Sequence, residues 1–500
     1  MKSYRYNHSA YKTGKTPAIV IGAGVGGLAM AIRLAIKGFE VDVFERNNYP
    51  GGKLSMFEKD GYLFDAGPSL FTQPANIIEL FQLAGEPIDD YFQFSNVPIA
   101  CRYFYEDGKI VNAYTEKELF AKELQSVVGE DPQAVIDYLK TAEKAYTSIG
   151  HIFLHFSLHK LSTWFNKRIF TAIGATKLEF LTLSMHQYHQ KKFKSPHTVQ
   201  LFNRFATYNG SNPYEAPAML SMIPHLEQNE GTFYPQGGMI SITNALYNLA
   251  LKLGVQFHFS TPVEKIVHEN GKATGVIALG KNHLAPLVIT NSDVFYLYKD
   301  LIQQPKEAAK TLKRERSSSA LIFYWGMKKE FPQLLLHNIF FTENYAAEFK
   351  NLFDTKTMYH DPTVYVNITA KQEPGQAPLG KENWFVMINA PADEGHDWEK
   401  IQQEVKKSVI QKLSNILGED IGAAIETEHI LNPKGIESET KSYKGSLYGT
   451  SSNSTFAAFL RHPNFSTTIE GLFCTGGSVH PGGGIPLSLK SAKIVSELID

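Results

Sequence analysis

The most regular pattern of apolar and polar positions lies near the amino terminus. The apolar run Ala18–Ile21 predicts a buried strand, and it leads directly into a glycine-rich turn over 22–27. Apolar residues then recur at helical spacing as far as Gly38, and the run 41–44 predicts a second strand. The chain therefore begins with a strand–turn–helix–strand unit, which is typical of a parallel α/β domain.

Later parts of the chain alternate between helical and strand-like patterns. Residues from 111 to about 225 have mostly helical spacing of apolar positions, and alternating elements return after Tyr234. We expect helices over 242–253 and 398–417, strands over 255–259, 261–266, 287–291, 320–325, 363–368 and 384–389, and a final helix after 486.

These patterns predict an α/β protein, α+β overall, whose first domain is discontinuous. The expected division is a mobile polar tail over 1–16, a Rossmann domain from 17–110, 230–295 and 465–500, a helical subdomain over 111–229, and a mixed-sheet substrate-binding domain over 296–464.

The first glycine-rich turn has the chemistry of a dinucleotide site. Gly22 permits a tight turn, Gly24 lets a pyrophosphate approach the backbone, and Gly27 lets the helix lie close to the sheet. The helix N-terminus then presents free N–H groups to the phosphates. Glu45, at the end of the second strand, is placed to accept hydrogen bonds from the adenosine ribose. An ordinary glycine-rich turn, the alternative, has no need for this acid.

Two further glycine clusters indicate which dinucleotide binds. The Gly51-Gly52-Lys53 run resembles the extended motif of the glutathione-reductase-like FAD proteins, and this resemblance implies FAD. Near the carboxyl terminus, a second strand and glycine turn open the final helix, whose N-terminus could face the flavin ring. The predicted FAD-binding residues are Gly22, Gly24, Gly26, Gly27, Glu45, Arg46, Gly51, Gly52, Lys53, Leu54, Gly67, Pro68, Ser69, Val263, Gly476, Gly477, Gly484, Ile485 and Pro486.

Composition narrows the remaining possibilities. The chain has 500 residues and a formal net charge of −1, which argues against nucleic acid as a partner. Its two cysteines, Cys101 and Cys474, stand in unrelated contexts, so we expect neither a disulfide framework nor a zinc site. No apolar run is long enough for a membrane span, and we predict none.

The segment 151–195 differs in charge from the rest of the chain. It contains seven Lys or Arg residues and one acid, Glu179, and positions 151, 155, 159, 162 and 166 would form a polar stripe on one helix. Basic charge beside broad apolar surface predicts a peripheral membrane contact, although a helix packed inside the protein would leave the same pattern. Histidines at 151, 155 and 159 have a metal-binding spacing, but the other histidine boxes and spans of di-iron desaturases are missing, so we predict no metal.

Several motifs together resemble those of the bacterial-type carotenoid desaturases, the family that includes phytoene desaturase. They are the amino-terminal fingerprint with Gly51-Gly52-Lys53, the runs Tyr62–Ser69 and Pro235–Met239, and the tail His480–Pro486. Val479 departs from the family pattern, in which a hydroxyl residue often precedes the histidine. The segment Glu382–Pro391 is similar to the 1-hydroxycarotenoid 3,4-desaturase branch.

The resemblance implies an FAD-dependent oxidoreductase that introduces a C=C bond into a long polyene by hydride transfer to flavin N5. It implies 3,4-desaturation of a 1-hydroxycarotenoid, with multistep desaturation of phytoene to lycopene, carotene isomerisation and a non-catalytic prenyl-binding escort protein as alternatives. It names no catalytic side chain. We expect a cytoplasmic protein attached peripherally to the inner face of the cell membrane; the sequence leaves the oligomeric state open.

Overall fold

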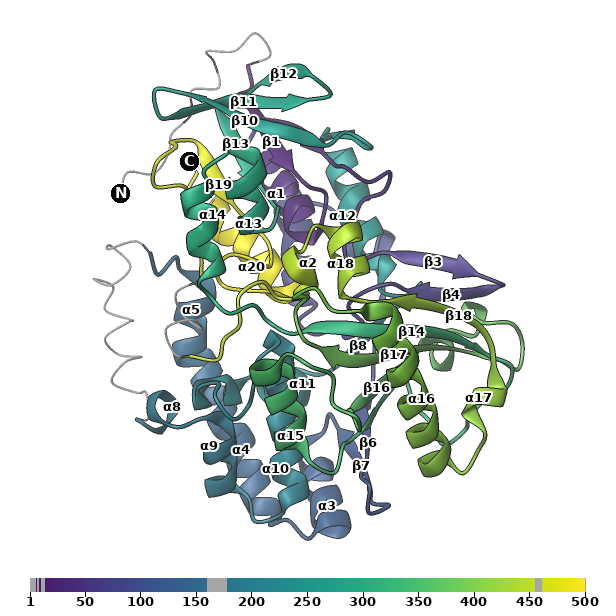
Figure 1. Ribbon diagram of the computed structural model, residues 1–500. Coiled ribbons are helices and arrows are strands. Elements are labelled where there is room, and N and C mark those ends of the chain that lie inside the picture. Colours follow the sequence, from purple (N-terminus) through teal and green to yellow (C-terminus); the bar gives the residue numbers. More distant parts are fainter. Residues whose placement is uncertain (1–5, 7–8, 10–13, 160–177, 455–460, 500) are drawn as a thin grey trace.

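The amino-terminal unit forms the centre of a parallel sheet. The computed structural model describes residues 6, 9, 14–159, 178–454 and 461–499, so most of the predicted tail lies outside the described residues. Strand β1 (Pro17–Ile21), helix α1 (Val25–Ile36) and strand β2 (Glu40–Phe44) follow the predicted order. The five-stranded sheet has the order β19-β13-β1-β2-β9, with β9 at Gln256–His258, β13 at Leu287–Thr290 and β19 at Leu472–Cys474. It therefore gathers strands from the start, middle and end of the chain (Figure 1).

Helix α1 is buried over most of its length, and its glycines and alanines allow neighbouring elements to approach closely. It lies against α2 (Ala75–Ala84), α12 (Ile240–Lys252) and α20 (Ile485–Ser496). Ala29 and Ala31 have no exposed surface, and a Cβ atom on Gly27 would lie 2.0 Å from the Gly22 carbonyl oxygen. The other face of the sheet is covered by the antiparallel strands β10 (Val263–Glu269), β11 (Lys272–Ala278) and β12 (Lys281–Leu284).

A second, seven-stranded sheet lies on the other side of a cavity from the parallel sheet. Its order is β18-β14-β17-β16-β15-β6-β7. The strands are β6 (Ile99–Phe104), β7 (Ile110–Tyr114), β14 (Ser319–Met327), β15 (His337–Phe340), β16 (Val364–Ile368), β17 (Glu382–Ala390) and β18 (Ile425–Leu431). Strand β6 pairs with β15, so residues 99–110 belong to this sheet and not to the predicted cofactor segment 17–110. The sequence did not indicate this, because no local pattern reveals so distant a partner.

Alternate residues of these strands face two different layers, as the period of a strand requires. Val405, Val409 and Leu413 of α16 (Trp398–Leu417) pack on one face, in a core that contains Trp325 and Trp384. The opposite face looks toward the helical region, and it carries residues such as Phe385 and Met387 that line a cavity.

The helical region is built from short helices around an aromatic core (Figure 1). Its helices are α3 (Lys117–Val128), α4 (Pro132–Ala145), α5 (His151–His155), α8 (Glu179–Thr182), α9 (Met185–Lys192), α10 (Pro196–Asn203) and α11 (Pro224–Gln228). The remaining elements include β3 (Met56–Lys59), β4 (Tyr62–Asp65), β5 (Phe94–Asn96), β8 (Phe233–Pro235), α13 (Val294–Tyr296), α14 (Pro305–Leu312), α15 (Tyr345–Lys350), α17 (Ile421–Ala424) and α18 (Pro433–Thr440).

One expectation for this region is wrong. Helix α5 ends at His155 because Phe156 adopts an extended conformation, with φ −125° and ψ 142°. His151, His155 and His159 therefore do not share one helical stripe, and the continuation of the predicted stripe falls in 160–177, outside the described residues. Within the described ranges no helix is long and apolar enough to cross a membrane. The same residues contain no group of three or more His, Cys, Asp or Glu side chains that could hold a metal ion.

Candidate cofactor and substrate site

A cavity of about 820 Å³ opens where the parallel strands end. Its walls include the last residues of β1 and β2 and the residues Asn291 and Ser292 that follow β13. Ligands of open α/β sheets bind at this carboxyl edge. Every residue predicted to bind FAD lines this cavity except Gly27 and Gly476. The fold thus brings the three predicted glycine clusters together, and their contact with the cofactor stays a prediction.

The two exceptions are glycines that allow close packing. Gly27 lies under the turn, where its missing side chain lets α1 approach Gly22. A Cβ on Gly476 would lie 2.1 Å from Asn291 Oδ1, and its φ is +95°. Both glycines therefore shape the cavity from behind its wall.

The first turn leaves backbone donors available to an anion. Gly24 is the N-cap of α1 and has no side chain that could cap the helix. The N–H groups of the first turn have no partner within the helix, so they are available to a ligand. A Cβ at Gly24 would lie 2.8 Å from the Asn291 amide nitrogen, which leaves no room for a larger residue. This arrangement fits a pyrophosphate at the helix N-terminus.

Glu45 is held firmly at the end of β2. Its Oε2 atom accepts a hydrogen bond from the Ala23 N–H at 2.7 Å, and its Oε1 atom accepts one from the Asn47 N–H at 2.8 Å. The residue is 6% exposed and lines the cavity. Each carboxylate oxygen can accept a further hydrogen bond, as the hydroxyls of a ribose require.

The second glycine pair and Lys53 form the opposite side of the cleft. The Gly51 N–H donates to Ala23 O at 2.8 Å, and a Cβ on Gly51 would lie 2.3 Å from Leu54 O. The Lys53 ammonium donates to Leu447 O at 2.9 Å. Burial lowers the pKa of Lys53 to about 8, although the nearby Asp293 carboxylate acts to raise it. Lys53 is therefore a poorly solvated cation that an anionic ligand would stabilise.

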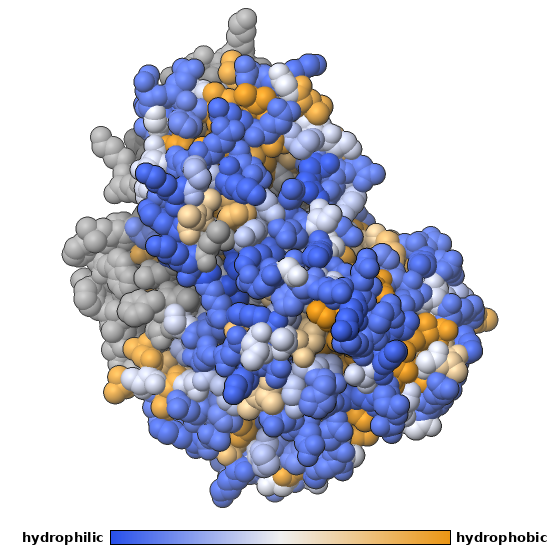
Figure 2. Space-filling model, viewed as in Figure 1, coloured by the Kyte–Doolittle hydropathy of each residue, from blue (hydrophilic) through white to orange (hydrophobic). Residues whose placement is uncertain are grey.

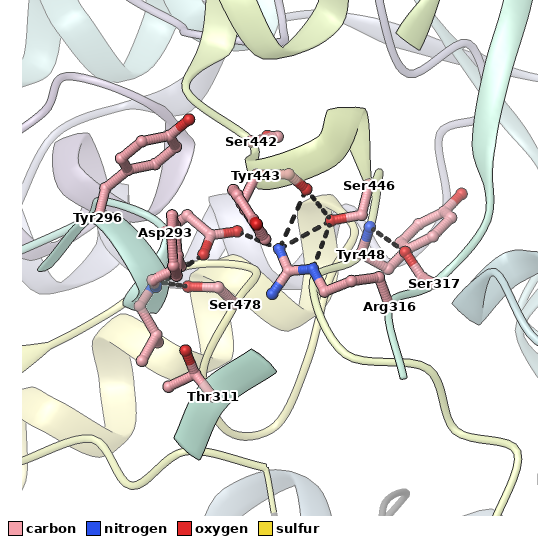
Figure 3. A network of polar contacts seen from close by, with 12 residues as sticks. Asp293, Tyr296, Thr311, Arg316, Ser317, Ser442, Tyr443, Ser446, Tyr448 and Ser478 are labelled. Carbon is pink, nitrogen blue, oxygen red and sulfur yellow. Dashed lines mark hydrogen bonds and ion pairs between the residues drawn. The ribbon is translucent and has the colours of Figure 1, made fainter. Parts of the chain in front are cut away.

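A polar network that the sequence analysis did not identify closes this side of the site (Figure 3). The Arg316 guanidinium forms a buried ion pair with Asp293 at 2.5 Å and donates to Ser446 Oγ at 2.8 Å. Ser478, in the tail loop, accepts a hydrogen bond from the Val294 N–H at 3.3 Å. The network joins the end of β13 to the segment 442–449, which supplies the carbonyl partner of Lys53. In the sequence, the signal for this network was an acid, Asp293, shortly after the predicted strand 287–291.

Two of the family-like motifs meet beside the cleft. Asp65 Oδ2 accepts a hydrogen bond from the Met239 N–H at 3.1 Å, so the 62–69 run is joined to the 235–239 run. Burial raises the pKa of Asp65 to about 6. Further along, Ser69 Oγ lies 2.8 Å from the Tyr365 hydroxyl of β16. The predicted cofactor segment 67–69 therefore reaches the seven-stranded sheet.

The tail completes the cleft. Gly484 is the N-cap of α20, with φ +103° and no side-chain cap, and Gly484–Pro486 line the cavity.

A family model described as flavin containing amine oxidoreductase matches residues 25–500. The chain belongs to this flavin-containing family. It is an oxidoreductase, its cofactor is FAD, and the three glycine clusters and Glu45 fit that group.

Named relatives agree with this assignment. The chain is 51% identical to a 1-hydroxycarotenoid 3,4-desaturase from Flavobacterium sp. (strain P99-3), over 96% of this chain and 98% of the relative. It is 31% identical to a 4,4'-diaponeurosporene oxygenase from Staphylococcus aureus (strain MSSA476), over 96% and 97% of the two chains. These matches confirm the predicted resemblance to the carotenoid desaturases. Wild-type putrescine oxidase bound to putrescine has the same fold, with a TM-score of 0.64, 14% identity, and coverage of 97% of this chain and 98% of that chain.

Away from the cleft, the flavoenzyme's cavity is bordered by the seven-stranded sheet and the helical region. Ile322, Phe385 and Met387 line it from the sheet, and Leu220 and Met222 line it from the helical side. These side chains make that part of the wall largely apolar. No side chain of the described wall is identified as an acid or base of the reaction.

A few polar side chains interrupt this apolar wall. Arg204 and Glu227 form an ion pair at 3.2 Å with side chains 10% and 1% exposed, and the Tyr208 hydroxyl donates to Glu227. His337 and Tyr365 line the cavity from β15 and β16. None of these five side chains was predicted from the sequence to belong to the site. Arg204 and Glu227 could have been noticed as charges within apolar stretches.

Proposed function

We propose that this flavoenzyme is a carotenoid desaturase that forms the 3,4 double bond of a 1-hydroxycarotenoid. The observation that carries the proposal is the 51% identity with a 1-hydroxycarotenoid 3,4-desaturase along nearly the whole of both chains. The apolar wall beyond the cofactor cleft supports it, because a polyene needs an apolar site.

The protein's own residues hold and shield the reacting groups. When bound, FAD supplies the chemistry, since its flavin accepts a hydride from the substrate. Glu45 and the uncapped N-terminus of α1 hold the adenosine and pyrophosphate, and the N-terminus of α20 lies at the cavity beside them. Ile322, Phe385 and Met387 orient an apolar chain and exclude water. Formation of the double bond also releases a proton from the neighbouring carbon, and we assign no protein base to that step.

The test is conversion of defined carotenoids by the FAD-loaded protein in liposomes. We expect a red-shifted product, lighter by two hydrogens, from a 1-hydroxycarotenoid and none from phytoene. Conversion of phytoene to lycopene would contradict the proposal and favour the multistep alternative. A product of unchanged mass would indicate an isomerase, and purified protein without a flavin spectrum would indicate an escort protein.

We also propose that the helical region docks on the inner, cytoplasmic face of an anionic membrane. Leu178 and Leu181, at α8, are 73% and 45% exposed. The Lys191 and Lys192 ammonium groups of α9 lie 3.9 and 3.6 Å from the carboxylate of Glu179, which follows Leu178 in the chain. Figure 2 shows apolar surface at this lower-left edge of the molecule. Exposed leucines beside basic residues suit the interface of an anionic bilayer, where a carotenoid dissolves.

Co-sedimentation with phosphatidylglycerol-containing vesicles tests this contact. The double variant Leu178→Asp with Leu181→Asp should lose most of the vesicle-bound fraction. Leu379→Asp is the control, since Leu379 is fully exposed on another part of the surface. Equal binding of both variants, or equal binding to zwitterionic vesicles, would refute the membrane contact.

A further inference from the structure

His337 is a buried histidine of the cavity wall, and one of its ring nitrogens has no hydrogen-bond partner among the described residues. It begins β15 and is 2% exposed. Its Nδ1 atom lies 2.8 Å from the Tyr365 hydroxyl and 3.1 Å from Asn367 Nδ2. Its Nε2 atom has no hydrogen-bond partner among the residues that the structure describes. The proposed function does not use this nitrogen.

The neighbours of His337 determine which nitrogen carries the proton. Asn367 Nδ2 can only donate, and it also donates to Leu336 O at 3.0 Å, which fixes the orientation of the amide. His337 Nδ1 must therefore accept from Asn367 and carries no hydrogen. Burial lowers the pKa of His337 to about 3, so the ring is neutral. The single ring proton lies on Nε2, which is thus a donor without an acceptor.

Tyr365 joins this histidine to the cofactor side of the cavity. The Tyr365 hydroxyl contacts His337 Nδ1 and also Ser69 Oγ at 2.8 Å. Ser69 belongs to the segment 67–69 that reaches the cofactor cleft. His337 is therefore separated from that segment by one side chain.

The Arg204 ion pair lies close to the same strands. The Arg204 guanidinium lies over the Tyr103 ring, 5.3 Å from its centre, and Tyr103 of β6 pairs with Ile339 of β15. Its positive charge is one of the causes that lower the pKa of His337, after burial. Arg204 donates to Glu227 through one terminal nitrogen, while its Nε–H, like His337 Nε2–H, has no acceptor among the described residues. Two buried N–H groups in this part of the wall, from His337 and Arg204, are therefore without an acceptor among the described residues.

A buried N–H without an acceptor costs about 1–3 kcal/mol. A hydrocarbon in the cavity would leave that cost in place, whereas an oxygen atom would remove it. We propose that His337 Nε2–H donates a hydrogen bond to the hydroxyl oxygen of an otherwise apolar isoprenoid substrate, in a pocket completed by Tyr365 and the Arg204–Glu227 pair. This hydroxyl pocket rests on the proposed function for the class of substrate.

The position of the hydroxyl gives the pocket a role in choosing the reacting bond. In a 1-hydroxycarotenoid the oxygen is attached to C1, and a 3,4-desaturase acts on the bond between C3 and C4, two carbons further along. A group that fixes this oxygen also fixes the C3–C4 bond. His337 is thus a specificity-determining residue that sets the register of the polyene.

Two substitutions separate the donor from the shape of the ring. The amide nitrogen introduced by His337→Gln reaches about as far as Nε2 and can donate, whereas the amide introduced by His337→Asn reaches only as far as Nδ1. We expect wild-type holoenzyme to favour a 1-hydroxycarotenoid over the deoxy compound of equal length by about tenfold or more in kcat/KM. His337→Asn should lower kcat/KM for the hydroxylated substrate about tenfold and change that for the deoxy compound by less than about threefold. His337→Gln should keep the preference. Equal losses on both substrates in His337→Asn would overturn the proposal, because they would indicate a structural role only.

A binding measurement on the wild-type holoenzyme does not depend on either variant. Titration of the dithionite-reduced holoenzyme, whose flavin cannot accept a hydride, with each carotenoid and tryptophan fluorescence as the signal should show about tenfold tighter binding of the hydroxylated one. Equal affinities would overturn the pocket. Tighter binding of the hydroxylated carotenoid without its conversion would refute the proposed reaction and retain the pocket. Equal conversion of both carotenoids would refute the pocket and retain the desaturation reaction.

Discussion

The two parts of the cavity are built in different ways. The cofactor cleft is made mostly from backbone atoms and glycines, and its first wall comes from residues 22–53. The substrate region is made from side chains of the seven-stranded sheet and the helical region. At Gly24, Gly27 and Gly51 glycine is required because a Cβ would meet backbone or amide atoms. In the substrate region, side-chain volume and polarity determine what fits.

This difference predicts different responses to substitution. A larger residue at a cleft glycine has to move the backbone, so it should abolish cofactor binding altogether. A substitution in the substrate region should alter stability or selectivity and leave FAD bound. The following predictions test this contrast, beginning with the largest expected effect.

Gly27→Ala should yield no FAD-loaded protein. The added methyl group would lie 2.0 Å from Gly22 O, and neither backbone can move without opening the β1–α1 turn. Overpacking costs about 1–3 kcal/mol and occasionally more. The ratio of flavin to protein absorbance measures the effect. The control is Gly38→Asn, since Gly38 has φ +87° with no atom within 4 Å and asparagine tolerates this conformation. A fully flavin-loaded Gly27→Ala protein would show that the packing argument is wrong.

Arg204→Met should destabilise the protein by about 3–5 kcal/mol while FAD still binds in the cleft. The substitution leaves the Glu227 carboxylate, 1% exposed, without its ion-pair partner. Urea unfolding of the holoprotein measures the loss. The double variant with Glu227→Leu is the matched control and should regain most of the stability, because no charge is then left unpaired. Equal stability of the single and double variants would contradict the burial of this pair.

Glu45→Ala should weaken FAD binding about 10- to 100-fold. The Ala23 and Asn47 N–H groups lose their acceptor, and the predicted ribose contact is lost as well. Titration of flavin-free protein with FAD gives the dissociation constant. Glu40→Ala, an exposed position on the same strand, is the control and should leave the affinity unchanged. Unchanged affinity in Glu45→Ala would remove Glu45 from the cofactor site.

Lys53 should give the smallest effect, a fall of a few-fold in FAD affinity as the pH rises from 7 to 9. In the flavin-free protein its pKa is lowered to about 8, and an anionic ligand would raise it, so affinity is full below that pKa and declines above it. The stability of the flavin-free protein should change in the opposite direction. The folded pKa lies below the unfolded value of 10.5, so stability rises as the pH increases from about 8 toward 10.5.

The Lys53→Met variant is the control for both pH trends, because it has no titrating group at this position. Its FAD affinity and its stability should lose these pH dependences. Identical pH profiles in the variant and the wild type would place Lys53 away from the phosphates.

Local patterns were sufficient for much of the fold. The expected helices over 242–253 and 398–417 correspond to α12 and α16, and the expected strands over 320–325 and 384–389 lie within β14 and β17. Two features of the fold did not follow from the local pattern of residues. The pairing of β6 with β15 depends on a partner far along the chain, and the extended turn at Phe156 ends a helix that periodicity alone continued.

The sequence by itself determined the cofactor cleft, because glycine spacing, a strand end and one acid act through the backbone within a short segment. The comparison with relatives then supported the family that those motifs indicate. Only the tertiary structure placed His337, Tyr365 and Arg204 around one cavity, because these residues come from a strand, a neighbouring strand and a helical turn far apart in the chain. The unsatisfied donors of His337 and Arg204 exist only once the surrounding residues exclude water, and no local pattern of residues records that.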